Sequence, residues 1–323
     1  PPDYSVNEIA GIAREAKVDS IVALGGGSCI DTAKGVSMLL TNEGTVSNYY
    51  DRTVPQNPGV FLIAIPTTAG TGSESTQGGV ITDTQTETKV VIAGAGTLVS
   101  MALLDPELTL GIPPHISAAT GFDALAHALD GFISSIANQY TKYQCEQGTR
   151  LFRRSIKEVV ANGENLQART DMMAASTTGG LIITGANCSL IHSFAHSLGA
   201  VYHAPHGNCC AIFMPAVLEF VSDVKPDEIK WMADLFDVSY DASHTSKRIA
   251  QMVGLKIWRL AKEMGLKSIE DYESDPEKMY QIVERAKTDV MTSTTPKPLD
   301  DEGAKWVIDR TYEISKEVSV ISV

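Results

Sequence analysis

The sequence has no long hydrophobic run, no excess of positive charge and no pattern of paired cysteines. Its longest apolar stretches, residues 60–65 and 211–218, fall far short of the roughly 18 residues that a membrane span requires. Acidic residues outnumber basic ones by 39 to 26, and the net charge of −13 repels nucleic-acid phosphates and anionic membranes. The five cysteines lack the spacing of a disulfide framework, and no signal-peptide pattern opens the chain. We therefore expect a cytoplasmic protein with neither nucleic-acid nor membrane partners.

The composition is that of folded domains, because 43% of the 323 residues are hydrophobic and 20% are charged. Short apolar runs between glycine-rich or polar loops predict strands at residues 20–24, 61–65, 79–82, 89–93 and 101–104. Further along, apolar residues recur with a helical period, and three amphipathic segments are expected on the outside of a helical bundle: 247–265, 276–291 and 300–314. We predict an α/β domain over residues 1–113 and an all-α domain over residues 114–323.

The chain opens with a helical pattern that ends near Lys17, ahead of the first expected strand. An α/β sheet seldom begins with a helix. We therefore expect a strand–helix unit to precede residue 1 in the full-length protein.

Two glycine-rich loops each follow an apolar strand. In the first, Gly25–Gly27 leads through Ser28 into a helix whose unpaired N–H groups suit a pyrophosphate, although the loop departs from GxGxxG and from the Walker pattern. A sharp bend with Ser28 and Asp31 as a helix cap is the plain alternative. The second loop, Ile65–Glu74, is rich in threonine and glycine, as in the nucleotide crevice of an open α/β sheet. The alternative interpretation is that both glycine-rich loops are polar surface turns.

Acid and imidazole side chains recur with helical spacing. Asp123 and His127 are four residues apart, as are His192 and His196, so each pair shares a helix face. With His206 nearby, these donors could bind a divalent transition ion, Fe²⁺ or Zn²⁺. Spacing alone leaves open which of the clustered histidines, His203 included, are ligands.

Cysteines also lie near this cluster. Cys209 and Cys210 could supply thiolates, but beside a carboxylate and histidines we interpret them as small buried side chains. His115 and His244 are expected to be solvated.

Five segments match the motifs of one known family, in the family's order and at similar intervals: GGGSCIDTAKG, IPTTAGTGSE, LLDPELTLGIPP, AATGFDALAHALDGFIS and IHSFAHSLGAVYHAPHG. Through these motifs the sequence resembles the iron-dependent (group III) alcohol dehydrogenases. The resemblance implies a dinucleotide-binding α/β domain, a helical metal-binding domain and an active site in the cleft between them. It also implies further N-terminal residues in a full-length chain.

Site roles follow from matching motif to motif. The resemblance implies that His196 is a non-ligand histidine near the nicotinamide, and we hypothesise that it relays the proton. It implies four metal ligands: Asp123, His127, His192 and His206. It implies dinucleotide contacts among the loop residues and beyond: Gly26, Gly27, Ser28, Asp31, Thr67, Thr68, Thr76 and Lys89.

The sequence departs from the family at a few positions. Cys29 stands where proline is frequent, Asp130 where glutamate is common, and Cys209 and Cys210 where small residues such as alanine or asparagine prevail. None of these departures removes an implied ligand.

The predicted reaction is reversible hydride transfer between a nicotinamide and a small primary alcohol or aldehyde. NAD is expected, with NADP as the alternative, and the oligomeric state, homo-oligomer included, is left open. One rival is a lyase of the dehydroquinate synthase type, which needs basic side chains for its anionic substrate. Near the metal motifs the sequence instead has apolar residues: Phe122, Leu125, Phe132, Leu190, Phe194 and Leu198. A second rival, a non-catalytic metal-storage or scaffold protein, would leave the glycine loops without a purpose.

Overall fold

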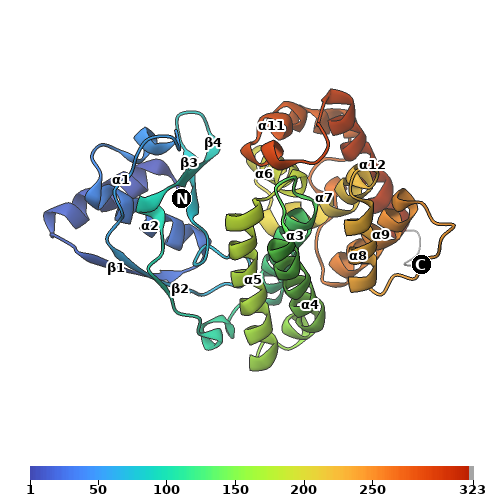
Figure 1. Ribbon diagram of the computed structural model, residues 1–323, viewed down its shortest axis with the longest axis horizontal. Coiled ribbons are helices and arrows are strands. Elements are labelled where there is room, and N and C mark those ends of the chain that lie inside the picture. Colours follow the sequence, from blue (N-terminus) through green and yellow to red (C-terminus); the bar gives the residue numbers. More distant parts are fainter. Residues whose placement is uncertain (320–323) are drawn as a thin grey trace.

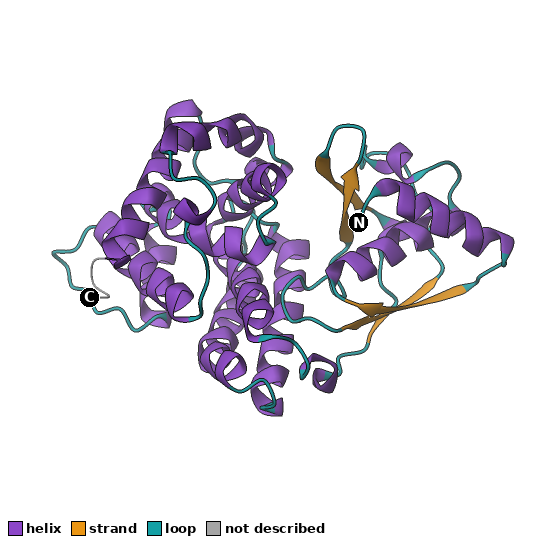
Figure 2. Ribbon diagram, turned by 180° about the vertical axis from the view of Figure 1, so that it is seen from behind, coloured by secondary structure: helices purple, strands orange, loops and turns teal. Residues whose placement is uncertain are grey.

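A computed structural model describes residues 1–319, which form an α/β part followed by a helical part (Figure 1). The two parts lie side by side, and every strand of the described residues belongs to the first part (Figure 2). The fold class is therefore as predicted.

The α/β part contains two separate pieces of sheet. Three strands form a parallel sheet in the order β1-β2-β5: β1 (Ser20–Gly25), β2 (Phe61–Pro66) and β5 (Met101–Ala102). The register pairs Ser20 with Phe61 and Gly25 with Pro66, so the carboxyl ends of β1 and β2 are level. The other two strands, β3 (Gly78–Asp83) and β4 (Thr88–Ala93), form an antiparallel hairpin. All five expected strands occur, but they do not form a single sheet.

Helix α2 (Gly27–Thr41) packs between the two sheets. Ile30 and Ala33 on α2 join Leu62 of the parallel sheet in one apolar cluster. Val36 on the same helix joins Ile81 of the hairpin and residues of α1 (Asp3–Glu15) in another. The helix therefore needs apolar residues on two of its faces.

The opposite face of the parallel sheet is open to solvent. Val22 and Leu24 of β1 are 63% and 57% exposed, and Phe61 of β2 is 51% exposed. The apolar run of β1 is typical of a buried parallel strand, but that interpretation is wrong, because the helices of the described chain cover only one face of this sheet (Figure 2).

The helical part is organised around α3, which is buried along most of its length. Pro114 begins α3, where its missing N–H costs no hydrogen bond. The helices are α3 (Pro114–Ile133), α4 (Gln139–Ala161), α5 (Leu166–Ala186), α6 (Leu190–Tyr202), α7 (His206–Val221), α8 (Pro226–Leu235), α9 (Ser246–Glu263), α10 (Pro276–Met279), α11 (Val283–Thr288) and α12 (Asp301–Ser319). One continuous apolar core joins them.

Two of the three expected outer helical segments are continuous helices, α9 and α12. The third, residues 276–291, is instead divided into α10, a 3₁₀ turn at Tyr280–Ile282 and α11, and a further 3₁₀ turn begins at Val290. In the described part of the chain, no helix is both long and apolar enough to cross a membrane.

Candidate metal and dinucleotide site

The two glycine loops lie against each other at the carboxyl ends of β1 and β2. The amide N of Thr67 donates to the carbonyl O of Gly25 at 3.0 Å. A Cβ added to Gly26 would lie 3.4 Å from the Thr68 side chain, and one added to Gly27 would lie 2.7 Å from that of Thr71. The close approach at Gly27 is therefore possible only because this position has no side chain, whereas a Cβ at Gly26 would lie at ordinary contact distance.

The start of α2 is free of a side-chain cap. Gly26 occupies the N-cap position, and no side chain within residues 1–319 caps the first turn. Ser28 lies inside the helix, and Asp31 Oδ2 accepts from the Val80 amide at 3.0 Å instead. The helix-cap alternative is therefore wrong. Within the first turn the Cys29 amide donates to the Gly26 carbonyl at 3.0 Å, which leaves the N–H groups of Gly27 and Ser28 available to an anion.

A cleft of about 530 Å³ separates the α/β part from the helical part. On the side of the α/β part, the cleft is lined by five of the implied dinucleotide contacts: Gly27, Ser28, Asp31, Thr76 and Lys89. On the side of the helical part, it is lined by Asp123, His127, His192, His196 and His206. Gly26, Thr67 and Thr68 do not line this cleft and lie in the loop contact described above.

Two of the implied dinucleotide contacts belong to a buried polar network. Lys34 Nζ, which is fully buried, donates to Thr76 Oγ1 at 2.6 Å and lies 4.0 Å from Asp31 Oδ1. It also donates to the carbonyl of Gly78 at 2.6 Å. Burial raises the pKa of Asp31 and lowers that of Lys34 to about 8. The network ties α2 to the hairpin beneath the cleft.

The four implied metal ligands come together on the helical side of the cleft. Asp123 Oδ1 lies 3.3 Å from His206 Nε2, 3.8 Å from His127 Nε2 and 3.8 Å from His192 Nε2. The rings of His127 and His192 are stacked, with centroids 4.7 Å apart. One carboxylate oxygen is thus surrounded by three imidazole nitrogens from three helices, α3, α6 and α7.

Ligands bonded at about 2.0–2.2 Å in a tetrahedron lie about 3.3–3.6 Å apart. The separation of Asp123 from His206 falls in this range, and those of Asp123 from His127 and His192, both 3.8 Å, are slightly longer. His192 Nε2 is buried and has no hydrogen-bond partner among the described residues, which is costly unless another atom binds there. A carboxylate with three imidazoles is also a donor set that suits Fe²⁺ and Zn²⁺. The residues therefore fit a divalent transition metal.

Electrostatics favour the ligand forms of Asp123, His127 and His206, but not that of His192. Burial lowers the pKa values of His127 and His206 to about 4, so both imidazoles are neutral at pH 7. Burial alone would raise the pKa of Asp123, but the surrounding histidines hold it well below its usual range. Burial would likewise lower the pKa of His192, yet nearby thiols and carboxylates raise it well above its usual value. The thiols and carboxylates around His192 thus favour a positive charge at this imidazole.

Asp130 holds His192 in place. Its Oδ2 lies 2.8 Å from His192 Nδ1 and accepts from the His192 amide at 3.1 Å, while Oδ1 accepts from the Ile191 amide at 3.2 Å. Asp130 is fully buried. A carboxylate on Nδ1 fixes the tautomer that presents Nε2 to a metal. Sequence reasoning noted Asp130 only as a departure from the family, although it shares a face of α3 with Asp123 and His127.

His196 belongs to the cleft but has a different partner. Its Nδ1 lies 3.0 Å from Asp289 Oδ2, and its ring stacks on that of His206 with centroids 5.3 Å apart. His203, the other histidine of the cluster, is exposed and has a left-handed backbone with φ 52° at the end of α6. Asp289 was missed because nothing in its local sequence points to a residue 93 positions away.

The apolar residues expected near the metal lie elsewhere. Phe122, Leu125 and Phe132 of α3 are fully buried in the helical core, as are Leu190, Phe194 and Leu198 of α6. They occupy the helix faces that turn away from the ligands. On the helical side of the cleft, the apolar lining comes instead from Ile136, Ile183, Val290 and Met291.

Two cysteines lie nearer to the centre than expected. Cys209 and Cys210 are both buried, as predicted, but Cys210 Sγ lies 3.8 Å from Asp123 Oδ1. Cys188 groups with His127 and His192 within 4.8 Å and lines the cleft. Sequence reasoning did not connect Cys188 with the site, because it lies in the loop before α6, where no periodicity applies.

An α/β part with glycine loops that faces a carboxylate–histidine cluster across a cleft is the arrangement of a metal-dependent dehydrogenase. The chain belongs to the iron-containing alcohol dehydrogenase family. The family model for iron-containing alcohol dehydrogenase matches residues 1–106, and that for the C-terminal part of the Fe-containing alcohol dehydrogenase family matches residues 117–312.

Individual proteins agree with the family models. A 1,3-propanediol dehydrogenase from Klebsiella pneumoniae is 36% identical over 266 residues, which are 82% of this chain and 68% of that protein. The structure of an alcohol dehydrogenase from Oenococcus oeni superposes with a TM-score of 0.91 at 33% identity, over 97% of this chain and 82% of that one. A sulfoacetaldehyde reductase from Bifidobacterium kashiwanohense, solved in complex with NAD⁺, gives a TM-score of 0.85 at 26% identity, over 96% of this chain and 81% of that one. These matches support the alcohol dehydrogenase prediction over the dehydroquinate synthase-like alternative.

Proposed function

We propose that this protein transfers hydride reversibly between NAD and a small primary alcohol or aldehyde at a centre that binds a divalent transition ion, Fe²⁺ or Zn²⁺. The observation that carries the proposal is the convergence of Asp123 Oδ1 with three imidazole nitrogens, 3.3–3.8 Å away, on one wall of a cleft. The opposite wall of that cleft carries the glycine loop and the uncapped start of α2. We also propose that the two domains meet at residues 113 and 114, where α3 begins.

Asp123, His127, His192 and His206 would hold the ion. A bound divalent ion supplies Lewis-acid polarisation of the substrate oxygen. Asp130 orients His192 through the 2.8 Å contact with Nδ1, so that Nε2 faces the other donors. Helix α3 places Asp123 and His127 on one face, and the packing of α6 and α7 against it brings the remaining imidazoles to the same point.

The first turn of α2 would bind the dinucleotide pyrophosphate. Its backbone N–H groups have no side-chain partner, and the partial positive charge of a helix N-terminus favours an anion. Ser28 and Lys89 also line the cleft and add a hydroxyl and a cation. The NAD⁺ complex of the sulfoacetaldehyde reductase relative supports NAD, with NADP as the alternative.

His196 would relay the proton that accompanies hydride transfer. Its Nδ1 is engaged by Asp289, which leaves Nε2 as the atom that exchanges a proton toward the cleft. Because its ring stacks on that of His206, it lies beside the metal centre without being one of the four converging ligands.

The cleft lining supports a small substrate. On the helical side, which carries the metal cluster, the cleft wall also contains Ile136, Ile183, Val290 and Met291, together with Thr184 and Asn187. Basic side chains of the lining, Arg52 and Lys89, belong to the α/β part rather than to the helices that carry the cluster. An uncharged alcohol therefore matches the surface nearest the ion, and a dehydroquinate synthase-type substrate does not.

The test combines metal analysis with a coenzyme assay. Protein purified anaerobically is analysed for iron and zinc, and oxidation of a panel of short primary alcohols is then followed with NAD and with NADP. We expect bound metal and net formation of the reduced coenzyme, faster with NAD. Metal binding without net coenzyme turnover on any alcohol would contradict the proposal, because a lyase with a closed redox cycle gives that result. Finding Zn²⁺ rather than Fe²⁺ in the purified protein would change only the identity of the ion and not the proposed reaction.

A further inference from the structure

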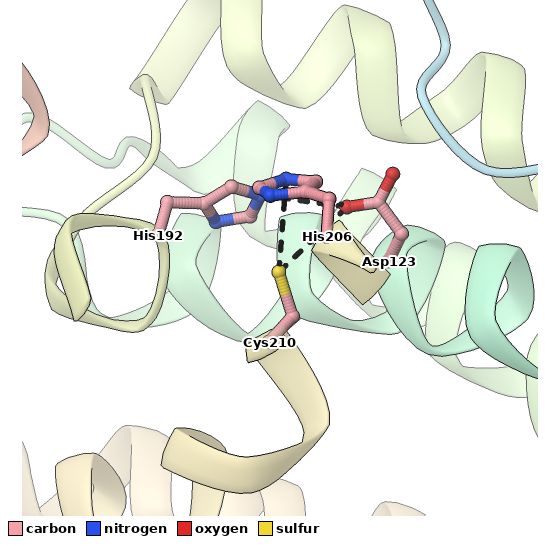
Figure 3. Close-up of side chains that lie close together, drawn as sticks. All are labelled: Asp123, His192, His206 and Cys210. Carbon is pink, nitrogen blue, oxygen red and sulfur yellow. Dashed lines mark hydrogen bonds and ion pairs between the residues drawn. The ribbon is translucent and has the colours of Figure 1, made fainter. Parts of the chain in front are cut away.

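A thiol lies at the same centre as the four family ligands. Cys210 Sγ is 3.8 Å from Asp123 Oδ1 and 3.8 Å from His206 Nε2. Figure 3 shows Cys210 extending from its helix toward both side chains. One donor atom from each of Asp123, His192, His206 and Cys210 lies within 4.8 Å of the other three. The sulfur is therefore close enough to share an ion with three of the four proposed ligands.

The separations suit coordination through sulfur. A sulfur bonded at about 2.3 Å and an oxygen or nitrogen bonded at about 2.0–2.1 Å lie about 3.5–3.8 Å apart when the bond angle is between tetrahedral and trigonal. The observed 3.8 Å is at the upper end of that range. His192 Nε2, a member of the same group, is buried without a hydrogen-bond partner among the described residues. That nitrogen is an independent sign that these donors need a shared centre.

Cys210 reaches the donors from the buried side. Its side chain is fully buried, and unlike Asp123 and His206 it does not line the cleft. A ligand in this position leaves the cleft side of the ion to the substrate. The packed α7 backbone also holds the sulfur in place, so its approach to the donors costs little side-chain entropy.

We propose that Cys210 is a further ligand of the metal ion and that its sulfur makes the centre prefer Zn²⁺ and Co²⁺ to Fe²⁺. The proposal rests on the proposed metal-dependent function and deepens it. On binding, an S–metal bond replaces the S–H bond and the proton passes to solvent. A carboxylate and three imidazoles serve iron and zinc alike, whereas a thiolate is a softer donor that favours zinc.

Cys188 is the rival source of sulfur. It forms a second donor group with His127 and His192, and it lies on the cleft wall. Coordination by Cys188 would place sulfur on the substrate side of the ion. The experiment must therefore distinguish the two cysteines.

Cobalt provides the direct test. Co²⁺ is added anaerobically to protein stripped of metal by a chelator, and the near-ultraviolet thiolate-to-cobalt charge-transfer band is recorded. We expect the band in the wild type, in Cys188→Ser and in Cys209→Ser, and its loss in Cys210→Ser. Cys209 is the matched control, because it is the adjacent buried cysteine of α7 and its sulfur has the Ala204 carbonyl, at 3.7 Å, as its hydrogen-bond partner among the described residues.

The outcomes separate the two proposals. If the wild type takes up no cobalt, the proposed metal centre fails and the ligand assignment fails with it. If cobalt binds with its d–d bands but without charge transfer, or if the band disappears in Cys188→Ser and persists in Cys210→Ser, only the assignment of Cys210 is wrong.

A second measurement needs no variant at Cys210. X-ray absorption of the zinc-loaded wild type should show one sulfur at about 2.3 Å beside nitrogen and oxygen at about 2.0–2.1 Å, and Cys188→Ser should retain that sulfur. A shell of nitrogen and oxygen alone would overturn the assignment.

A competition experiment between zinc and iron tests the metal preference. The preference for zinc over iron should fall about tenfold or more in Cys210→Ser and stay unchanged in Cys209→Ser.

Discussion

His192 Nδ1 lies 2.8 Å from Asp130 Oδ2, and both side chains are buried within the helical part. The same carboxylate accepts from the backbone amides of Ile191 and His192, so it fixes the start of α6 as well as the orientation of the imidazole. A proposed metal ligand and the carboxylate that supports it thus lie on different helices and 62 residues apart in the chain.

Asp130→Asn tests this support. The amide cannot accept from all three donors as the carboxylate does, so we expect metal affinity to fall about 10–100-fold. Competition with a chromogenic chelator measures the change. Asp171→Asn is the matched control: Asp171 is a buried carboxylate that accepts from Arg154 and Ser155, away from the cleft. Equal losses of metal in the two variants would show that Asp130 has only a structural role.

His196→Ala and His206→Ala should have opposite signatures. His206 Nε2 lies 3.3 Å from Asp123 Oδ1, so its removal should abolish tight metal binding. His196 is paired with Asp289 instead, so its removal should leave metal content unchanged and lower kcat about 10²–10⁴-fold. Metal analysis and steady-state kinetics of both purified variants check the division. Equal metal loss in both would contradict it.

The sequence alone predicts those features that depend on local pattern. The starts of the strands are right to within one residue, because each strand is a short apolar run next to glycine or polar residues. The pairs Asp123–His127 and His192–His196 lie on helices as expected, because residues four apart share a face.

What could not be predicted depends on packing between distant segments. Spacing cannot show that His203 is exposed while His206 points inward, since the difference is a left-handed residue at the end of α6. Nor can it bring Asp289 to His196, or Cys210 to Asp123, because those contacts require the fold of α6, α7 and the segment after α11. The open face of β1 is missed for the same reason: an apolar run does not say whether a helix covers it.

Gly27→Ala tests the loop contact that precedes α2. An added Cβ would lie 2.7 Å from the Thr71 side chain, so the two glycine loops would have to separate. We expect dinucleotide affinity to fall about tenfold, equivalent to about 1.4 kcal/mol, with metal content unchanged. Titration of the bound dinucleotide by fluorescence or calorimetry measures the effect. Gly11→Ala is the control, because no atom lies within 4 Å of a Cβ added in α1. Equal dinucleotide affinity in Gly27→Ala and Gly11→Ala would show that the loop contact does not contribute to dinucleotide binding.

The buried Lys34 predicts how stability depends on pH. Burial lowers its pKa from 10.5 to about 8, whereas in the unfolded chain the ammonium keeps the ordinary value. Between these two pKa values the unfolded chain binds a proton that the native protein has released, so the free energy of unfolding contributed by Lys34 rises with pH. Below about pH 8 both states are protonated and the contribution is constant. From pH 8 to pH 9 the gain should be about 1 kcal/mol.

Urea unfolding of the wild type and of Lys34→Met at pH 7, 8 and 9 isolates this contribution. Lys34→Met should be less stable throughout, since Thr76 and Gly78 lose their donor, but its profile should lack the rise above pH 8. Lys157→Met, at an exposed lysine paired with Glu263, should follow the wild-type profile because that ammonium is not desolvated. Parallel profiles for the wild type and Lys34→Met would mean that the Lys34 ammonium stays charged in the native state, held by Asp31 and the three oxygens that accept from it.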